Sequence, residues 1–129
     1  MVREARGKPE SGPRWHKDLE VRQAAVRLAR DIYAATRHLP SEERFGLSAQ
    51  LRRSAVSIAS NIAEGAARQG TKEFVQFLYV AAGSASELDT QLEIAKGLPA
   101  ASDLDLNGLQ SQVESVAKML RAMIRSLKA

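Results

Sequence analysis

The chain has 129 residues, a net charge of +4 and no cysteine. This length suits one domain with its own hydrophobic core, and the lack of cysteine excludes disulfides, thiolate metal sites and cysteine nucleophiles. The charged N-terminus has no apolar run behind it, and no segment reaches the roughly 20 apolar residues that a membrane span needs. The sequence therefore predicts a cytoplasmic protein without a signal peptide or membrane contact.

The first 16 residues combine glycines and prolines with charged side chains, which predicts a flexible basic N-terminal tail. Residues 17–129 are predicted to form a single bundle domain. Its first helix is expected over about 17–38, because apolar residues recur there at alternating spacings of four and three. Pro40 disfavours a helical conformation in the residue before it and ends this helix.

The second helix is predicted over about 42–66, with Ser41 as its N-cap. Its apolar stripe runs from Phe45 to Ile62. The third helix is predicted over about 71–97, with Thr71 as its cap. Gly83 lies in its middle, where glycine costs roughly 1 kcal/mol relative to alanine, so we expect another backbone to pass close to it.

The fourth helix is predicted over about 103–128, where residues 102–105 read SDLD, a capping-box pattern. Its apolar residues keep the same alternation of three and four. Four long helices with short connections are typical of an all-α, antiparallel, up-down-up-down four-helix bundle.

A polar stripe on the second helix is a candidate site. If the second and third helices fold back near Arg68, Glu64 faces Lys72, and Arg53 lies near Ser84 and Glu87. This set could form a ligand groove or a structural polar cluster. The structural interpretation is favoured because buried charges must be paired. The cluster comprises Arg53, Asn61, Glu64, Lys72 and Glu87.

A basic face on the fourth helix is a second candidate, for nucleic acid, with an ordinary solvated face as the alternative. The first helix is expected to extend this face. With few aromatic residues in the sequence, backbone contacts are expected rather than base stacking. The candidate binding residues are Arg27, Arg30, Arg37, Lys118, Arg121, Arg125 and Lys128.

Surplus small and apolar residues on the second and third helices indicate self-association, with a thick core as the alternative. Ala59, Gly83 and Ser84 are the candidate close-packing and interface positions. Catalysis is not expected, because His16 and His38 are the only histidines and neither pairs with carboxylates on one helix face. No metal site or cofactor motif is present in the sequence pattern.

Two segments resemble the 23S rRNA intervening-sequence protein family, a group of four-helix-bundle proteins. They read QLRRSAVSIASNIAEGAAR from residue 50 and EFVQFLYVAAGSASELDTQLEIA from residue 73. The resemblance covers about residues 18–127 and implies a ring-shaped homopentamer. It extends distantly to the accessory variability determinants of diversity-generating retroelements, basic pentamers that bind reverse transcriptase and nucleic acid. The molecular function of the family is largely undefined.

The sequence thus favours a non-enzymatic, homo-oligomeric interaction protein without a cofactor. Its expected partners are further copies of itself and RNA, DNA or a nucleic-acid enzyme. The alternative is a scaffold that recruits proteins and binds no nucleic acid.

Overall fold

A computed structural model describes residues 13–129, with side chains from residue 18 onward. This part of the chain forms four α-helices and two short 3-10 helices and contains no strand, which confirms the predicted all-α class. The α-helices are α2 (Pro13–Thr36), α3 (Leu47–Ala66), α4 (Thr71–Ala95) and α5 (Leu106–Lys128). The 3-10 helices are η1 (Ser41–Glu43) and η2 (Pro99–Ala101).

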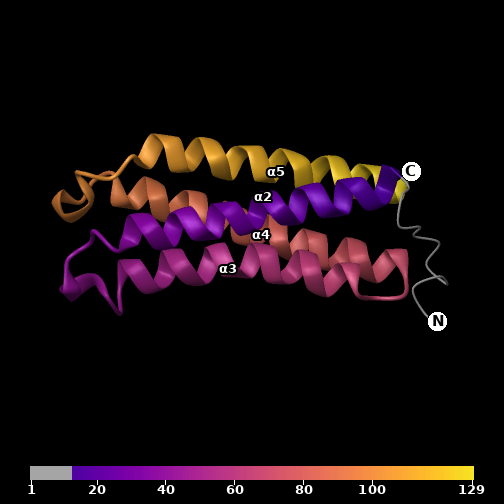
Figure 1. Ribbon diagram of the computed structural model, residues 1–129, viewed down its shortest axis with the longest axis horizontal. Coiled ribbons are helices and arrows are strands. Elements are labelled where there is room, and N and C mark those ends of the chain that lie inside the picture. The colour runs from indigo at the N-terminus through magenta and orange to yellow at the C-terminus, as the bar shows by residue number, and fades with distance from the viewer. Residues whose placement is uncertain (1–12) are drawn as a thin grey trace.

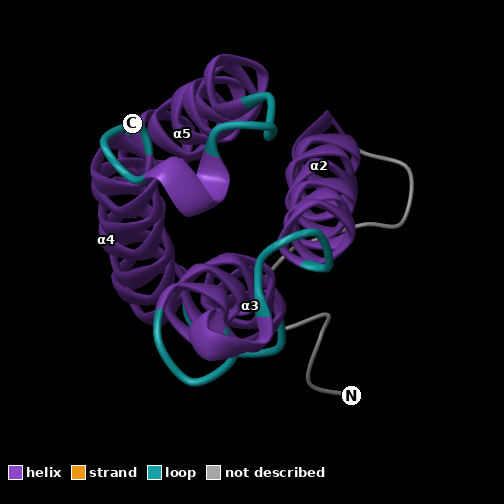
Figure 2. Cartoon of the chain, turned by 90° about the vertical axis from the view of Figure 1, so that its left-hand side faces the viewer, coloured by secondary structure: helices purple, strands orange, loops and turns teal. Residues whose placement is uncertain are grey.

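The four helices lie side by side, and the chain turns back at each connection (Figure 1). Viewed along their length, they surround a common centre in the order α2, α3, α4, α5 (Figure 2). Helix α3 packs most extensively against α4, while the contact between α2 and α5 is the weakest of the neighbouring pairs. Within residues 13–129 no helix combines the length and apolar character that crossing a membrane requires.

The core contains most of the apolar stripes that the sequence predicts. Phe74 and Leu28 are fully buried in it, together with a stripe from every helix. Phe45 is the exception: it was expected at the start of the α3 stripe, yet its side chain is 85% exposed. The residue lies before the helix begins, so the periodicity of α3 does not direct its ring toward the core.

The helix starts differ from the predicted ones. Helix α2 begins at Pro13, so the last four residues of the predicted tail belong to it, while residues 1–12 lie outside the described part of the chain. Helix α3 begins at Leu47 instead of near residue 42. Ser41 is not its cap, because Ser41 lies within η1 and Gly46 occupies the N-cap position of α3. Glu43 takes over part of this role, because its Oε1 accepts a hydrogen bond from the Leu47 backbone N–H at 3.3 Å.

The other two starts also depart from the predicted caps. Thr71 does not cap α4, which follows Gly70 without a side-chain capping bond. Helix α5 begins at Leu106 instead of 103, and Asp105 caps it by accepting a hydrogen bond from the Gly108 N–H at 3.0 Å. Residues 99–101 form η2 just before, and Ala101 is fully buried there, while residues 102–105, predicted to open the helix, form a turn between η2 and α5.

The close helix approach expected at Gly83 occurs elsewhere within this chain. Within the described residues, and apart from the backbone of α4 itself, a Cβ atom on Gly83 would meet no atom within 4 Å. A Cβ atom on Gly65 would lie 2.7 Å from Cβ of Phe77 and 2.9 Å from Cδ1 of Phe74. Gly65 is therefore the glycine that lets α3 and α4 approach, because any larger residue would displace α4.

Candidate nucleic-acid interface

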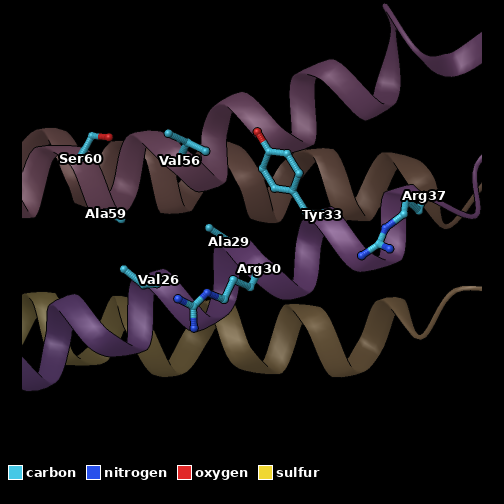
Figure 3. A pocket seen from close by; sticks show the side chains of 8 residues that line it. All are labelled: Val26, Ala29, Arg30, Tyr33, Arg37, Val56, Ala59 and Ser60. Carbon is cyan, nitrogen blue, oxygen red and sulfur yellow. The ribbon is translucent and has the colours of Figure 1, made fainter.

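Small side chains along the seam between α2 and α3 leave a hollow on the surface. Ala29 on α2 and Ala59 on α3 lie on the facing sides of the two helices (Figure 3). Two alanines cannot fill the space between helix backbones that larger residues occupy elsewhere. The resulting hollow has a volume of about 400 Å³ and is completed by Val26, Arg30, Tyr33, Arg37, Val56 and Ser60.

A second hollow of about 640 Å³ adjoins the first, because Tyr33 and Val56 line both. It extends toward the connection between the two helices and is completed by Arg44, Phe45, Ala49, Arg52, Arg53 and Ser57. We refer to the two hollows together as the α2–α3 groove. Its lining residues come from α2, from α3 and from the turn that precedes α3.

Five arginines line this groove: Arg30, Arg37, Arg44, Arg52 and Arg53. Within residues 18–129 no ion pair joins any of them to an acidic side chain. Arg53 bonds only the neutral Gln50, at 3.4 Å. A guanidinium keeps its charge at any physiological pH, so the groove gathers five positive charges, none in an ion pair within residues 18–129.

Arg52 is held in place across the seam. Its Nε donates to the Thr36 hydroxyl oxygen at 2.8 Å, and its Nη2 donates to the Tyr33 carbonyl oxygen at 3.4 Å. The guanidinium lies over the Tyr33 ring, 4.5 Å from the ring centre. These contacts fix the side chains of both Arg52 and Tyr33, and they tie α2 to α3 at the middle of the groove.

Two aromatic side chains of the groove face solvent. Tyr33 is 43% exposed and extends from α2 toward α3 (Figure 3). Phe45 is 85% exposed, with the guanidinium of Arg44 positioned 5.2 Å from its ring centre. Arginines and exposed rings are therefore interleaved along one surface, which the sequence analysis did not anticipate.

The basic residues of α5 lie apart from this groove. Gln112 bonds Asp31 of α2 at 3.0 Å, which identifies the edge of α5 nearest to α2. Lys128 lies on the opposite edge, because its Nζ donates to the Tyr79 hydroxyl of α4 at 3.1 Å. Arg121 forms an ion pair with Glu114 at 3.1 Å. Lys118 and Arg125 are exposed on the same helix.

The structure places some residues of the predicted basic face on different surfaces. Arg30 and Arg37 line the groove on the α3 side of α2, whereas the α5 residues face outward or toward α4. Arg27 is exposed but lines neither hollow of the groove. The cause is geometric, because residues on the two flanks of one helix point in different directions even when they are close in sequence.

The predicted polar cluster is also rearranged. Glu64 forms its ion pair with Arg68 at 2.7 Å and not with Lys72. The partner of Ser84 is Ser57, at 2.7 Å, one helical turn beyond the predicted Arg53. Asn61 donates to the carbonyl oxygen of Ser57 at 2.8 Å, and no ion pair of the described residues includes Glu87. No hydrogen bond or ion pair of the described residues joins Arg53, Asn61, Glu64 and Glu87 to one another.

Sequence reasoning missed Tyr33, Arg44, Phe45 and Arg52. One available indication was the spacing of Arg30, Tyr33 and Arg37, which lie three and four residues apart and so share one helix face. Another was the Arg44–Phe45 pair directly before a glycine. In the part of the chain that the structure describes, no three acidic or histidine side chains lie close enough to hold a metal ion.

Residues 17–122 match the family model described as 23S rRNA-intervening sequence protein. The chain is also similar to a crystal structure from Bacteroides thetaiotaomicron, described as a protein with unknown function from the S23 ribosomal protein family. The two share 25% sequence identity with a TM-score of 0.77, over 84% of this chain and 98% of the other. No curated protein matches the chain significantly.

Proposed function

This chain belongs to the 23S rRNA-intervening sequence protein family, and we propose that it is a non-enzymatic, self-associating interaction protein that binds nucleic acid through the α2–α3 groove. The proposed unit is an antiparallel up-down-up-down bundle that assembles into a ring-like pentamer. One observation carries the binding proposal: five arginines line one groove without an acidic partner among the described residues.

Arginine suits this role because its planar guanidinium presents paired N–H donors that match phosphate oxygens. Arg30 and Arg37 have no side-chain hydrogen bond within residues 18–129 that phosphate binding would break. Binding of this kind releases counterions, so the affinity falls as salt rises, with a slope set by the number of phosphates contacted. The groove would thus hold the nucleic-acid backbone with little sequence readout.

The outer surface of α4 supports self-association. Val80 and Ile94 are 52% and 58% exposed, and Gly83 lies on the same side of the helix, with no other helix of the described residues near its Cβ position. Exposed apolar residues grouped on one face of a charged protein are typical of a protein interface. A glycine among them leaves room for the backbone of another copy.

The binding proposal is tested by fluorescence anisotropy with a labelled RNA and a labelled DNA at several salt concentrations. The double variant Arg30→Gln/Arg37→Gln should lose affinity for both and reduce the slope of log affinity against log salt by up to about 1 per arginine. Lys118→Gln/Arg125→Gln is the matched control, because it removes two exposed positive charges from α5.

An equal loss in the α5 control would move the binding surface to α5 and contradict the groove assignment. If neither nucleic acid binds at low salt, the proposal fails and the alternative is a scaffold that recruits proteins. A pull-down that recovers a protein after nuclease treatment and a high-salt wash would then support that alternative.

Self-association is tested separately by light scattering. Gly83→Leu places a bulky side chain on the outer surface of α4 and should produce smaller assemblies than the unaltered protein. Because position 83 is open within the chain, the variant is expected to fold. An unchanged mass would exclude Gly83 from the contact between copies.

A further inference from the structure

We infer that the α2–α3 groove takes single-stranded nucleic acid, whose bases stack on Phe45 and Tyr33 while the surrounding arginines hold the phosphates. This inference rests on the proposed binding of nucleic acid at the same groove and names the class of strand. It depends on the two exposed rings and not on the positive charge alone.

Phe45 is the first part of the argument. Its ring is 85% exposed, more than any other exposed large apolar side chain of the described residues, so it contributes little to folding. The residue lies in the turn before α3, at the end of a groove lined by Arg44 and Arg53. A nucleobase laid on the ring would cover this apolar surface, and such stacking contributes about 1–3 kcal/mol per base.

Tyr33 is the second part. Its ring lies at the junction of the two hollows, and Arg52 covers it at 4.5 Å while bonded to Thr36 and to the Tyr33 carbonyl. The ring and guanidinium therefore form a stack that exists before any ligand binds. A base can extend this stack, because arginine planes and aromatic rings both accept bases on their faces.

The shape of the groove favours a single strand over a duplex. In a duplex the base faces are stacked on one another, so they are not available to protein rings. The floor between the arginines is apolar, with Val26, Ala29, Val56 and Ala59, and gains little from contact with the phosphates of a duplex. From Val26 to Arg37 the groove extends roughly 16 Å along α2 at 1.5 Å per residue, which fits a short run of nucleotides.

The experiment compares an oligothymidylate of about 12 nucleotides with an abasic strand of the same length, which has the phosphates and no bases. The unaltered protein should bind the oligothymidylate about tenfold more tightly, and Phe45→Ala should remove that preference. Phe45→Trp should keep it, because a larger ring still stacks. The high exposure of Phe45 makes all of these variants compatible with folding.

The outcomes distinguish base stacking from the more general proposal that the groove binds nucleic acid by charge. Equal, salt-sensitive binding of both strands would overturn base stacking and leave the electrostatic proposal intact, whereas binding of neither would overturn both. Tighter binding of a duplex than of either strand would also overturn the inference. So would smaller assemblies of Phe45→Ala in light scattering, because Phe45 would then be covered by a second copy of the chain.

Discussion

Two basic regions of this bundle carry similar numbers of positive charges in different surroundings. The α2–α3 groove is hollowed, has an apolar floor, and contains five arginines without an ion pair to any acidic side chain among the described residues. The basic residues of α5 lie along one helix surface, where Arg121 is paired with Glu114 and Lys128 is bonded to Tyr79.

The difference shows that the partners of a cation matter more than the count of cations. A cation already paired with a carboxylate gains less from a phosphate, because it must give up one anion to bind another. Acidic residues also lie close to α5 on α4, where Gln110 donates hydrogen bonds to Asp89 at 3.2 Å and to Glu93 at 3.0 Å. Among the described residues, one of the four basic α5 side chains is ion-paired, whereas none of the five groove arginines is.

The largest effect is expected from a negative charge placed inside the groove. Val56 is 41% exposed and lines both hollows, so Val56→Glu would put a carboxylate beside several arginines. At the dielectric of a protein surface this should weaken nucleic-acid binding by about tenfold or more at low salt. Anisotropy titrations measure the loss, and thermal unfolding should change little because surface substitutions usually shift stability by less than about 0.5 kcal/mol.

Ala122→Glu is the matched control for this comparison. It adds the same charge to an exposed position on α5, four residues after Lys118 and three before Arg125. Binding should change much less than in Val56→Glu. If Ala122→Glu has the larger effect, the contrast between the two regions is reversed and α5 is the binding surface.

A smaller effect is expected on folding stability. The comparison is between two variants that each remove one arginine, one from the groove and one from α5. Arg52→Gln loses hydrogen bonds to Thr36 and to the Tyr33 carbonyl that join two helices, and should lower the free energy of unfolding by about 1 kcal/mol. Arg121→Gln loses only an exposed pair within α5, which should cost at most about 0.5 kcal/mol. Urea denaturation gives both values, and equal losses would show that Arg52 does not tie α2 to α3.

Much of the fold was predictable because helical periodicity reports directly which residues are buried. The stripes from Val21 to Ile32 and from Phe74 to Leu92 are in the core as predicted. The helix starts were less predictable, because several side chains compete to cap the same turn. Ser41 matched the usual cap preference, yet the helix begins after Gly46 and Glu43 bonds its first N–H.

The candidate site was less predictable, because it depends on how two helices face each other. Periodicity assigns a residue to one face of its own helix. It does not tell which residue of a neighbouring helix lies at the same position along the bundle axis. An error of one turn paired Ser84 with Arg53 instead of Ser57. The groove itself arises from Ala29 opposite Ala59, a pairing across the seam that neither helix reveals alone.

The smallest expected effect concerns Glu93 on α4, whose carboxylate accepts a hydrogen bond from Gln110 of α5. The pKa of Glu93 lies below its usual value, mainly because Gln110 donates a hydrogen bond to its carboxylate and secondly because Lys96 is nearby. Gln110→Ala should therefore raise the Glu93 pKa toward its usual value in an NMR titration, and Lys96→Gln should raise it as well.

The same lowered pKa fixes the sign of a pH effect on stability. A carboxyl group whose pKa is lower in the folded state stabilises the fold above its usual pKa, and this contribution is lost as the pH falls through the lowered value. Gln110→Ala should therefore lower the free energy of unfolding at neutral pH, where Glu93 is charged. In acid, where Glu93 is protonated, the variant and the unaltered protein should not differ for this reason. If Gln110→Ala leaves the Glu93 pKa unchanged, this explanation is wrong. The hydrogen bond from Gln110 of α5 would then not be the cause of the lowered pKa.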